Sequence, residues 1–434
     1  MRKTVLLILT LSLAAWGCRG DKAAGTAAEG GPQASQAASA AFVTVKDGKF
    51  MLSGRPFYFV GANFWQGMNL AVDGPSGDRP RLLRELDRLR DLGVTNLRVM
   101  ASSEGPNTEP YRMVPALMTS PGEYDGSVLD GLDFLLAEMG KRGQRAVMVL
   151  NNFWQWSGGM AQYVSWHEKT PIPYPGDYPK FVDYSAKFYG YPECQDWFRD
   201  HIAMIVGRTN PYTGLKYRDD PAVFSWELGN EPRRYPQGWI DDTSAYIHSL
   251  DPNHMVTTGS EGAPPEEKGQ DFVKTHSSPG IDYVTIHIWP QNWDWYDPKR
   301  PATYKAKAEP LAIEYFKKLA DQTKAMGKPL VLEEFGLARD WATKHNNYDP
   351  ASTTTTKDLY YAALYKLVED SIASGGPAMG DNFWAWAGEA RPGGKPWVGD
   401  PPHEPAGWYS VYDADASTIA IISGHAKRIA ELTK

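Results

Sequence analysis

The chain has 434 residues, 42% of them hydrophobic and 22% charged, with a formal net charge of −7. This composition is typical of a soluble globular protein, and the length suits one large α/β barrel with insertions. The sequence has no basic block or stripe, which argues against a nucleic-acid partner and disfavours an anionic polysaccharide. A neutral substrate fits this charge better.

The N-terminal residues have the pattern of an export signal. Arg2 and Lys3 precede an apolar segment at 5–15 that is too short to span a membrane as a helix. The following Gly17 and Cys18 resemble the end of a bacterial lipobox, whose cysteine is lipidated after cleavage. We therefore expect residues 1–18 to be a signal peptide and Cys18 to be lipidated. The protein would be exported, either anchored in the cell envelope through this lipid or secreted, with no other membrane contact.

Residues 19–41 consist mainly of small and polar amino acids and predict a flexible linker. The folded part is expected to run from 42 to 434 as a single catalytic domain, and the protein is expected to be a monomer. Two short apolar runs at 43–45 and 50–52, separated by a polar turn, predict a small N-terminal β-hairpin at the bottom of the barrel.

Strand-like and helix-like segments then alternate eight times. The predicted strands are 58–62, 96–100, 146–151, 223–228, 255–258, 283–287, 330–333 and 380–384, and the clearest helices are 79–92, 128–142, 197–209, 308–326, 359–373 and 418–432. Eight such units with right-handed crossovers predict an α/β fold of the (β/α)8 TIM-barrel class. A doubly wound sheet is the alternative, but Gly61–Trp65 after the first strand is not a glycine-rich phosphate loop.

Polar side chains stand at the ends of six predicted strands, and these ends share one catalytic face in a barrel. They are Arg98, Asn151 with Asn152, Asn230 with Glu231, His287, Glu334 and Trp384. Glu231 and Glu334 come from distant strands and provide the two carboxyl groups that hydrolysis of a glycosidic bond requires. Several tryptophans lie in the loops after strands, where an aromatic face suits a sugar ring, although core packing is the alternative for each one.

Of the two cysteines, only Cys194 belongs to the folded part, so no internal disulfide can form there. The sequence has no cysteine and histidine spacing typical of zinc sites. Cys194 could in principle be a nucleophile, but no catalytic motif surrounds it.

The strand-end motifs resemble those of the β-mannanases of glycoside hydrolase family 5, in clan A. The segments that carry the resemblance are Gly61–Trp65, Asn151–Trp154, Ser157–Tyr163, Trp226–Arg233, Thr285–Pro290 and Glu333–Gly336. The resemblance covers residues 42–434. It implies a retaining endo-β-1,4-mannanase that acts on mannan, glucomannan or galactomannan, with no metal and no organic cofactor.

The resemblance also implies a role for each matching residue. Glu231 would be the general acid/base and Glu334 the nucleophile, because the family places its nucleophile directly before an aromatic-glycine pair. Glu333 is the rival nucleophile, but side-chain alternation predicts that it points away from the site. Arg98 would keep Glu334 ionised, since an adjacent cation lowers the pKa of a carboxyl group. The other predicted substrate-binding residues are Trp65, Asn152, Asn230 for the 2-hydroxyl, Arg233, His287, Trp289 and Trp384.

Trp289 departs from the wider family, in which a tyrosine hydroxyl at this position bonds to the nucleophile. An indole N–H can donate one hydrogen bond but cannot accept one. Trp289 is predicted to belong to the site, and the group that positions Glu334 is left open.

Two other functions remain as alternatives. A β-1,4-glucanase is the nearest enzyme, because mannose and glucose differ only at the 2-hydroxyl. A non-catalytic glycan-binding protein could use the same fold, but it would not need both Glu231 and Glu334. The choice between endo and exo action depends on loops that wall or open the cleft. Serine hydrolases and metallopeptidases are excluded because their motifs are missing.

Overall fold

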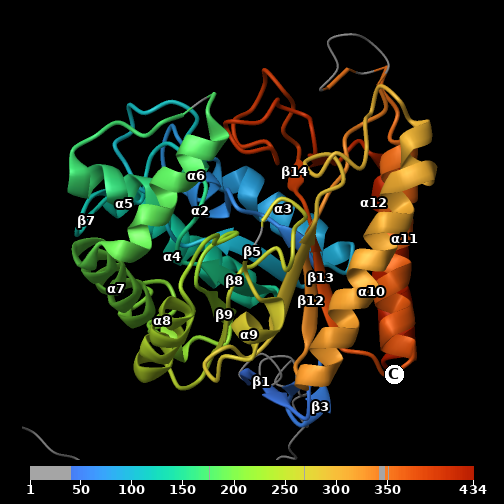
Figure 1. Ribbon diagram of the computed structural model, residues 1–434, viewed down its shortest axis with the longest axis horizontal. Helices are drawn as coiled ribbons and strands as arrows, with labels where there is room; N and C mark the ends of the chain where they lie inside the picture. Colours follow the sequence, from blue (N-terminus) through green and yellow to red (C-terminus); the bar gives the residue numbers. More distant parts are fainter. Residues whose placement is uncertain (1–40, 175, 268, 342–347, 350) are drawn as a thin grey trace, which may run out of the picture.

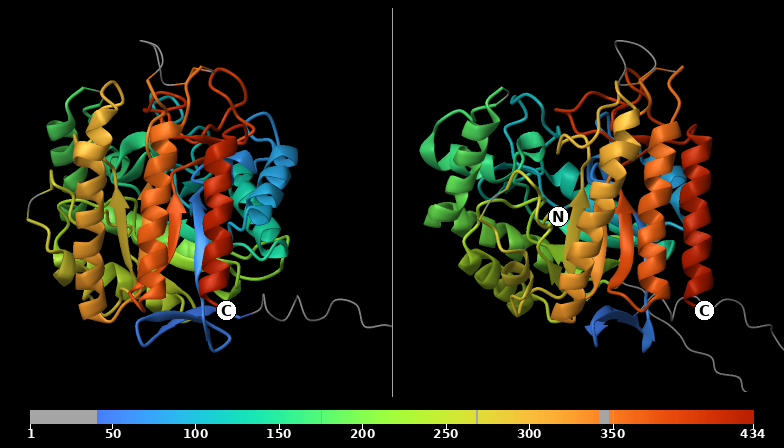
Figure 2. Two further views of the ribbon diagram at one scale, coloured as in Figure 1. Left: turned by 90° about the vertical axis from the view of Figure 1, so that its right-hand side faces the viewer. Right: turned by 45° about the vertical axis from the view of Figure 1, so that its right-hand side comes forward.

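A computed structural model describes residues 41–174, 176–267, 269–341, 348–349 and 351–434. Its centre is an eight-stranded parallel sheet, surrounded by helices, as expected for a (β/α)8 barrel (Figures 1 and 2). The predicted signal peptide, the lipidation site Cys18 and the linker up to residue 40 lie outside the described residues. Within the described residues, no helix combines the length and apolarity that a membrane span requires.

The eight strands form in the predicted order along the chain. They are β4 (Phe59–Asn63), β5 (Asn96–Met100), β8 (Arg145–Val149), β9 (Val223–Glu227), β10 (Met255–Thr257), β11 (Val284–Ile288), β12 (Leu330–Phe335) and β13 (Ala378–Phe383). Every residue of these strands is buried, as expected for parallel strands covered on both faces. Their spatial order is β10-β9-β8-β5-β4-β13-β12-β11.

The barrel closes between β10 and β11 through single hydrogen bonds rather than a regular ladder. The Asp282 N–H donates to the Val256 carbonyl at 2.8 Å, and Thr257 Oγ1 donates to the Tyr283 carbonyl at 3.1 Å. Further along, the His287 N–H donates to the Glu261 carbonyl at 3.0 Å. Closure of the barrel here lets His287 on β11 reach Glu231, which follows β9.

Helices follow each strand and cover the outside of the barrel. They are α2 (Gly67–Leu70), α3 (Arg79–Asp91), α4 (Gly126–Lys141), α5 (Gly159–Glu168), α6 (Tyr178–Ala186), α7 (Pro192–Gly207), α8 (Gln237–Leu250), α9 (Phe272–His276), α10 (Glu309–Met326), α11 (Thr355–Ala373) and α12 (Ala416–Leu432). Most predicted helices begin and end within a few residues of these bounds. The main difference is α7, which starts at Pro192 instead of 197 because Pro192 occupies the first helical turn, where its missing N–H is tolerated.

The N-terminal hairpin is confirmed, with a third short strand added. Strands β1 (Val43–Lys46), β2 (Lys49–Leu52) and β3 (Arg55–Pro56) form an antiparallel sheet below the barrel (Figure 1). Phe50 is fully buried and packs edge-on against Phe224 and Tyr283, at 5.2 and 5.3 Å between ring centroids. The hairpin therefore closes the N-terminal end of the barrel with an apolar plug.

The opposite end of the barrel carries the long connections. The β8 strand is followed by α5, α6 and α7, and β13 is followed by the short strands β14 (Trp386–Gly388) and β15 (Val411–Tyr412). The segment that joins β14 to β15 projects at the top of Figure 1, on the far side of the molecule from the hairpin. These loops surround the carboxyl ends of the strands, where ligands bind in barrels of this class.

Candidate active site

The two predicted catalytic glutamates meet at the carboxyl ends of β9 and β12. Glu231 and Glu334 are 8% and 2% exposed, and one carboxylate oxygen of each lies within 4.8 Å of the other and of His287. A retaining glycosidase needs its two carboxyl groups ~5–5.5 Å apart, whereas an inverting enzyme leaves ~6.5–9.5 Å for a water molecule. The observed separation belongs to the retaining geometry.

The backbone at Glu231 is strained. Glu231 lies four residues after the end of β9 and has a φ of 49°, in the left-handed region that side-chain-bearing residues rarely adopt. Two hydrogen bonds hold this turn: the Asn230 N–H donates to the Asn151 carbonyl and the Glu231 N–H donates to the Gly259 carbonyl, both at 2.9 Å. Such strain persists only where the surroundings enforce it, and it is common at functional sites. Here the turn directs the Glu231 carboxylate toward His287.

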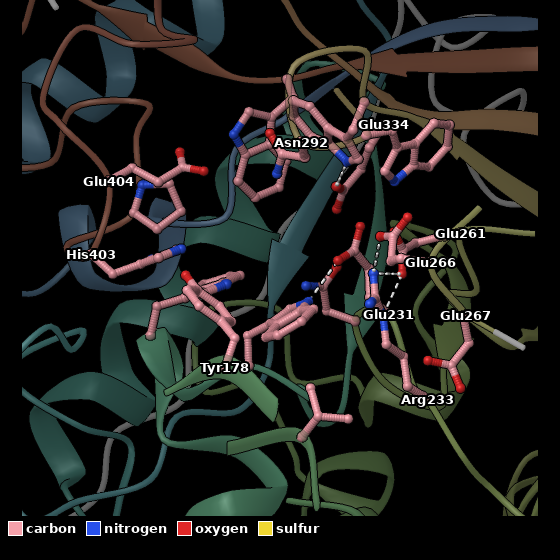
Figure 3. A pocket seen from close by; sticks show the side chains of 18 of the residues that line it. Tyr178, Glu231, Arg233, Glu261, Glu266, Glu267, Asn292, Glu334, His403 and Glu404 are labelled. Carbon is pink, nitrogen blue, oxygen red and sulfur yellow. Dashed lines mark hydrogen bonds and ion pairs between the residues drawn. The ribbon is translucent and has the colours of Figure 1, made fainter. Parts of the chain in front are cut away.

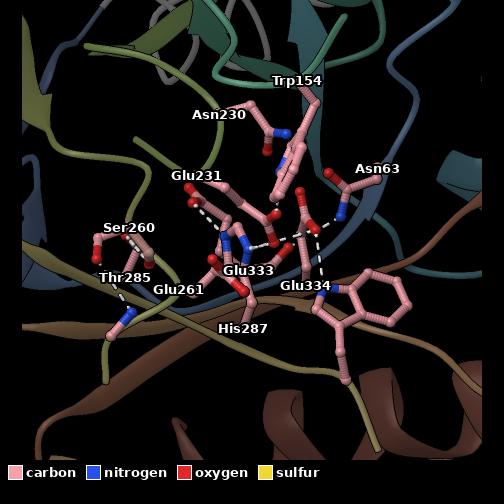
Figure 4. A network of polar contacts seen from close by, with 12 residues as sticks. Asn63, Trp154, Asn230, Glu231, Ser260, Glu261, Thr285, His287, Glu333 and Glu334 are labelled. Carbon is pink, nitrogen blue, oxygen red and sulfur yellow. Dashed lines mark hydrogen bonds and ion pairs between the residues drawn. The ribbon is translucent and has the colours of Figure 1, made fainter. Parts of the chain in front are cut away.

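His287 links the two glutamates (Figure 4). Its Nδ1 lies 2.8 Å from Glu231 Oε1 and 3.3 Å from Glu334 Oε2. Its Nε2 lies 3.3 Å from Glu333 Oε2. The imidazole is fully buried between three carboxylates, so a proton on it is strongly favoured.

The protonation pattern follows from these contacts. Burial lowers the pKa of His287, but Glu334, Glu231 and Glu333 outweigh it and raise that pKa to about 10. Burial has the largest single effect on Glu231 and raises its pKa, but the hydrogen bond and charge of His287, the charge of Arg233 and the hydrogen bond from Trp154 together outweigh it and leave this pKa below its usual value. The three groups therefore share a proton that resides on His287, next to Glu231.

Arg98 on β5 lies beneath the pair and joins three strands. It donates through Nε and Nη2 to the two oxygens of Glu227, at 2.7 and 2.6 Å, and through Nη1 to Glu334. Its Nη2 also donates to Asn230 Oδ1 at 2.7 Å. The guanidinium is 3% exposed, so it acts from below the site and does not face the substrate.

Arg98 lowers the pKa of Glu334, as expected, but burial has a larger effect. Burial raises the pKa of Glu334 to about 7, although His287 and Arg98 both act in the opposite direction. The sequence does not reveal how deeply Glu334 is buried or that Glu227 shares its cation. Glu227 could have been noticed as a charged residue inside an apolar strand, because such a residue is almost never buried without a partner.

Glu333 and Glu334 do not lie on opposite faces of the strand as predicted, because both contact Arg98 and His287. Glu333 lies 3.7 Å from Arg98 and contacts His287, so it belongs to the same buried cluster. A register shift between β11 and β12 pairs Ile286 with Leu332 but His287 with Glu334, which breaks the simple alternation of side chains. Of the two adjacent glutamates, only Glu334 lines the cavity described below.

Trp289 provides the positioning group that the sequence left open. Its indole Nε1 donates to Glu334 Oε2 at 3.2 Å, from the residue position where the wider family has a tyrosine. The ring is 6% exposed and packs edge-on against Trp384 at 5.9 Å. An indole can hold the nucleophile by donation alone, since the carboxylate is the acceptor.

A cavity of about 590 Å³ opens above the two glutamates (Figure 3). Its walls combine aromatic and polar side chains, as is usual for small-molecule sites. The lining residues are Trp154, Trp156, Tyr178, Pro179, Val182, Asn230, Glu231, Arg233, Arg234, Glu261, Glu266, Glu267, Trp289, Asn292, Trp293, Glu334, Trp384, Pro401, His403 and Glu404. The cavity thus includes six predicted site residues, namely Glu231, Glu334, Asn230, Arg233, Trp289 and Trp384.

Four predicted substrate-binding residues lie behind the cavity wall instead. Arg98 and His287 hold the catalytic carboxylates, as described above. Asn152 accepts hydrogen bonds from the Trp154 N–H at 3.0 Å and from Asn230 Nδ2 at 3.1 Å. Trp65 is 3% exposed and donates to the Gly399 carbonyl at 2.7 Å. Each is satisfied by protein partners, so its role is to position other residues.

Several residues that face the cavity were missed because loops distant in sequence bring them there. Trp154 donates from Nε1 to Glu231 Oε2 at 2.6 Å, which fixes the acid/base from the side opposite His287. Glu261 and Glu266 were also missed; they hold the predicted Arg233 at 2.6 and 3.0 Å. Other additions include Tyr178, Asn292, His403 and Glu404. Among these missed residues, only the tryptophans could have been noticed in the sequence, because they cluster in loops after strands.

Cys194 is not part of this site. It is buried in α7, and burial raises the pKa of its thiol to about 12, so it is protonated and unreactive near neutral pH.

A parallel barrel with two carboxyl groups at retaining separation, set among aromatic walls, defines a glycoside hydrolase. A family model described as "GH family 5 beta-mannosidase-like" matches residues 40–434, so the chain belongs to this glycoside hydrolase family. Mannan endo-1,4-beta-mannosidase 7 of Arabidopsis thaliana is 31% identical over 370 residues, which cover 80% of this chain and 78% of that protein.

Solved structures agree with this assignment. The glycoside hydrolase family 5 mannosidase from Rhizomucor miehei matches with a TM-score of 0.84 and 38% identity, covering 91% of this chain and 99% of that one. The endo-1,4-beta-mannanase from the same organism shares the fold, with a TM-score of 0.66 and 23% identity over 90% of this chain and all of that one.

Proposed function

We propose that this chain is a retaining endo-β-1,4-mannanase that cleaves mannan, glucomannan or galactomannan. The observation that carries the proposal is the Glu231–His287–Glu334 cluster, whose carboxyl oxygens lie within 4.8 Å of one another at the floor of an aromatic cavity. The curated relative in Arabidopsis thaliana is named for this activity and aligns over most of both chains.

The geometry assigns a role to each glutamate. Glu334 attacks the anomeric carbon while Glu231 protonates the leaving oxygen, and a covalent glycosyl-enzyme forms. Water then attacks the same carbon with Glu231 as the base, so the configuration is retained. Glu334 is held in place by Trp289 and Arg98 during both steps.

The proton for the first step is already beside Glu231. It resides on His287 Nδ1, 2.8 Å from Glu231 Oε1, and can pass along this hydrogen bond as the leaving oxygen develops charge. Trp154 donates to the other oxygen of Glu231 and keeps the carboxyl group oriented. Glu231 is ionised in the resting cluster, so His287 supplies the proton that Glu231 must donate.

An exo-acting β-mannosidase is the second candidate. Its support is the mannosidase of Rhizomucor miehei, which at 38% identity and a TM-score of 0.84 is more similar to this chain than the endo-mannanase of that organism. A variant of that mannosidase was solved in complex with mannosyl-fructose.

One set of assays tests these proposals. The purified protein is incubated with mannan, glucomannan and carboxymethyl-cellulose, and the products are resolved by chain length. We expect internal cleavage of mannan into oligosaccharides of mixed length, and no such activity in Glu334→Gln. Release of mannose alone from chain ends would favour the mannosidase, and activity on cellulose without activity on mannan would overturn both.

We further propose that the protein is exported as a monomer and anchored by a lipid on Cys18. The charged residues Arg2 and Lys3, the apolar segment at 5–15 and the lipobox-like end support this proposal. In a bacterial host, the full chain should partition into membranes, whereas a Cys18→Ala variant should not. Equal partitioning of the two would contradict lipidation, and light scattering of the released protein should give the mass of one chain.

A further inference from the structure

One wall of the cavity is formed by the segment between β14 and β15 and has no part in the mechanism above. Pro401, His403 and Glu404 line the cavity from this segment. Figure 3 shows His403 and Glu404 across the cavity from Arg233 and Glu267, with the catalytic glutamates between the two sides.

Hydrogen bonds within this segment, and one from the barrel, hold it in place. The Asp400 carboxylate accepts the backbone N–H groups of Gly407, Tyr409 and Ser410 at 2.6, 2.6 and 3.1 Å. Trp65, at the end of β4, donates to the Gly399 carbonyl at 2.7 Å. The wall is therefore a built part of the site rather than a loose loop.

Two buried polar atoms on this wall have no hydrogen-bond partner in the part of the chain that the structure describes. Glu404 Oε2 and His403 Nδ1 make no hydrogen bond to any of the described residues, and an unpaired buried polar atom is unfavourable. Burial, and then the negative charges of Asp400, Glu334 and Glu231, hold the pKa of Glu404 well above its usual range. A protonated carboxyl group offers one donor and one acceptor, which suits sugar hydroxyl groups.

The chemistry decides which part of the substrate meets this wall. Glu231 protonates the leaving oxygen, so the leaving part of the chain extends toward Arg233, which lies on that side of the cavity. The sugar whose anomeric carbon reacts lies over Glu334, and the chain beyond it extends toward the opposite side. Glu404 and His403 are on that opposite, glycone side.

We propose that Glu404 and His403 are specificity-determining residues that bind hydroxyl groups of a sugar unit on the glycone side and limit how many units fit there. This inference rests on the proposed cleavage of β-mannosidic bonds. It implies that the position of the cut along an oligosaccharide is set by this wall, with short glycone fragments favoured over long ones.

The test compares Glu404→Ala, Glu404→Gln and His403→Ala with the unmodified protein on 4-nitrophenyl β-mannoside, mannotriose and mannohexaose. We expect Glu404→Ala to lower kcat/KM about 10- to 100-fold and to shift cleavage of mannohexaose toward longer glycone fragments. Glu404→Gln should stay within about fivefold, because an amide also offers donors and an acceptor. His403→Ala should shift the products in the same direction.

Glu389→Ala is the matched control. Glu389 belongs to the same connection, but its carboxylate bonds to Arg84 at 2.6 and 2.8 Å, outside the cavity. This variant should keep the kcat/KM and product pattern of the unmodified protein. A purely structural role of Glu404 would lower the thermal midpoint but leave the product pattern unchanged.

Unchanged products and kcat/KM in folded Glu404→Ala would overturn the inference. If that variant does not fold, unchanged products in His403→Ala would do so instead. An unmodified protein that cleaves none of the three mannosides would refute the proposed function. That outcome differs from an active protein whose products do not depend on Glu404 or His403, which would refute only the inference about these two residues.

Discussion

The two ends of the barrel are built from opposite kinds of side chain, although the same eight strands supply both. At the N-terminal end, Phe50 from the hairpin meets Phe224 and Tyr283 in an apolar plug. At the carboxyl end, Arg98 and His287 hold a cluster of buried glutamates. The plug contributes hydrophobic stabilisation, whereas the buried charges offset their desolvation only through mutual contacts. The first end stabilises the fold, and the second performs the chemistry.

The largest expected effect comes from removing the nucleophile at the carboxyl end. Glu334→Gln should lower kcat on mannan by at least about 1,000-fold, because an amide cannot form the glycosyl-enzyme. The free energy of unfolding in urea should not fall at neutral or higher pH, because the amide keeps the shape of the side chain and the raised pKa of Glu334 shows that burial penalises its charged form. An active Glu334→Gln protein would contradict the assignment of catalysis to the carboxyl end of the barrel.

The matching change at the other end is Phe50→Ala. It should lower the free energy of unfolding by about 3–5 kcal/mol, the usual cost of deleting a buried aromatic ring. The kcat/KM of the folded variant should stay at the unmodified value, because the plug touches no residue of the cavity. A large loss of kcat/KM without loss of stability would show that the plug shapes the site.

The pH dependence of kcat/KM tests the charged end alone. Glu334 must be ionised to attack, and its pKa is raised to about 7, so protonation below that value removes activity. We expect kcat/KM to fall up to about tenfold per unit as the pH drops below this point. The alkaline decline should come later, since the pKa of His287 is raised to about 10. An acidic limb near pH 4 would contradict this assignment.

The smallest expected effect concerns the positioning of the nucleophile. Trp289→Phe keeps an aromatic ring but removes the N–H that donates to Glu334 at 3.2 Å. One hydrogen bond to a carboxylate corresponds to about a 10- to 100-fold loss in kcat/KM at most. The acidic limb should also move to higher pH, because the ionised form of Glu334 loses a donor. A limb that stays in place would mean that Arg98 and His287 position this carboxylate without Trp289.

The sequence alone determined the barrel, its strands and its catalytic pair. Apolar runs that end in Glu231 and Glu334 can be recognised locally, since burial of a parallel strand leaves a continuous hydrophobic segment. The hairpin followed from the same kind of local pattern, with a polar turn between two apolar runs. These features depend on neighbours along the chain, so local reasoning was sufficient.

The tertiary structure decided which groups act on the pair. The register shift beside Glu333 directs its side chain toward the buried cluster of Arg98 and His287. The depth of burial raises the pKa of Glu334 although Arg98 lowers it. Glu404 lies 70 residues beyond Glu334 in the sequence and reaches the cavity only because Asp400 and Trp65 hold its segment there. Charge, burial and wall position depend on contacts between distant segments, and no local pattern encodes them.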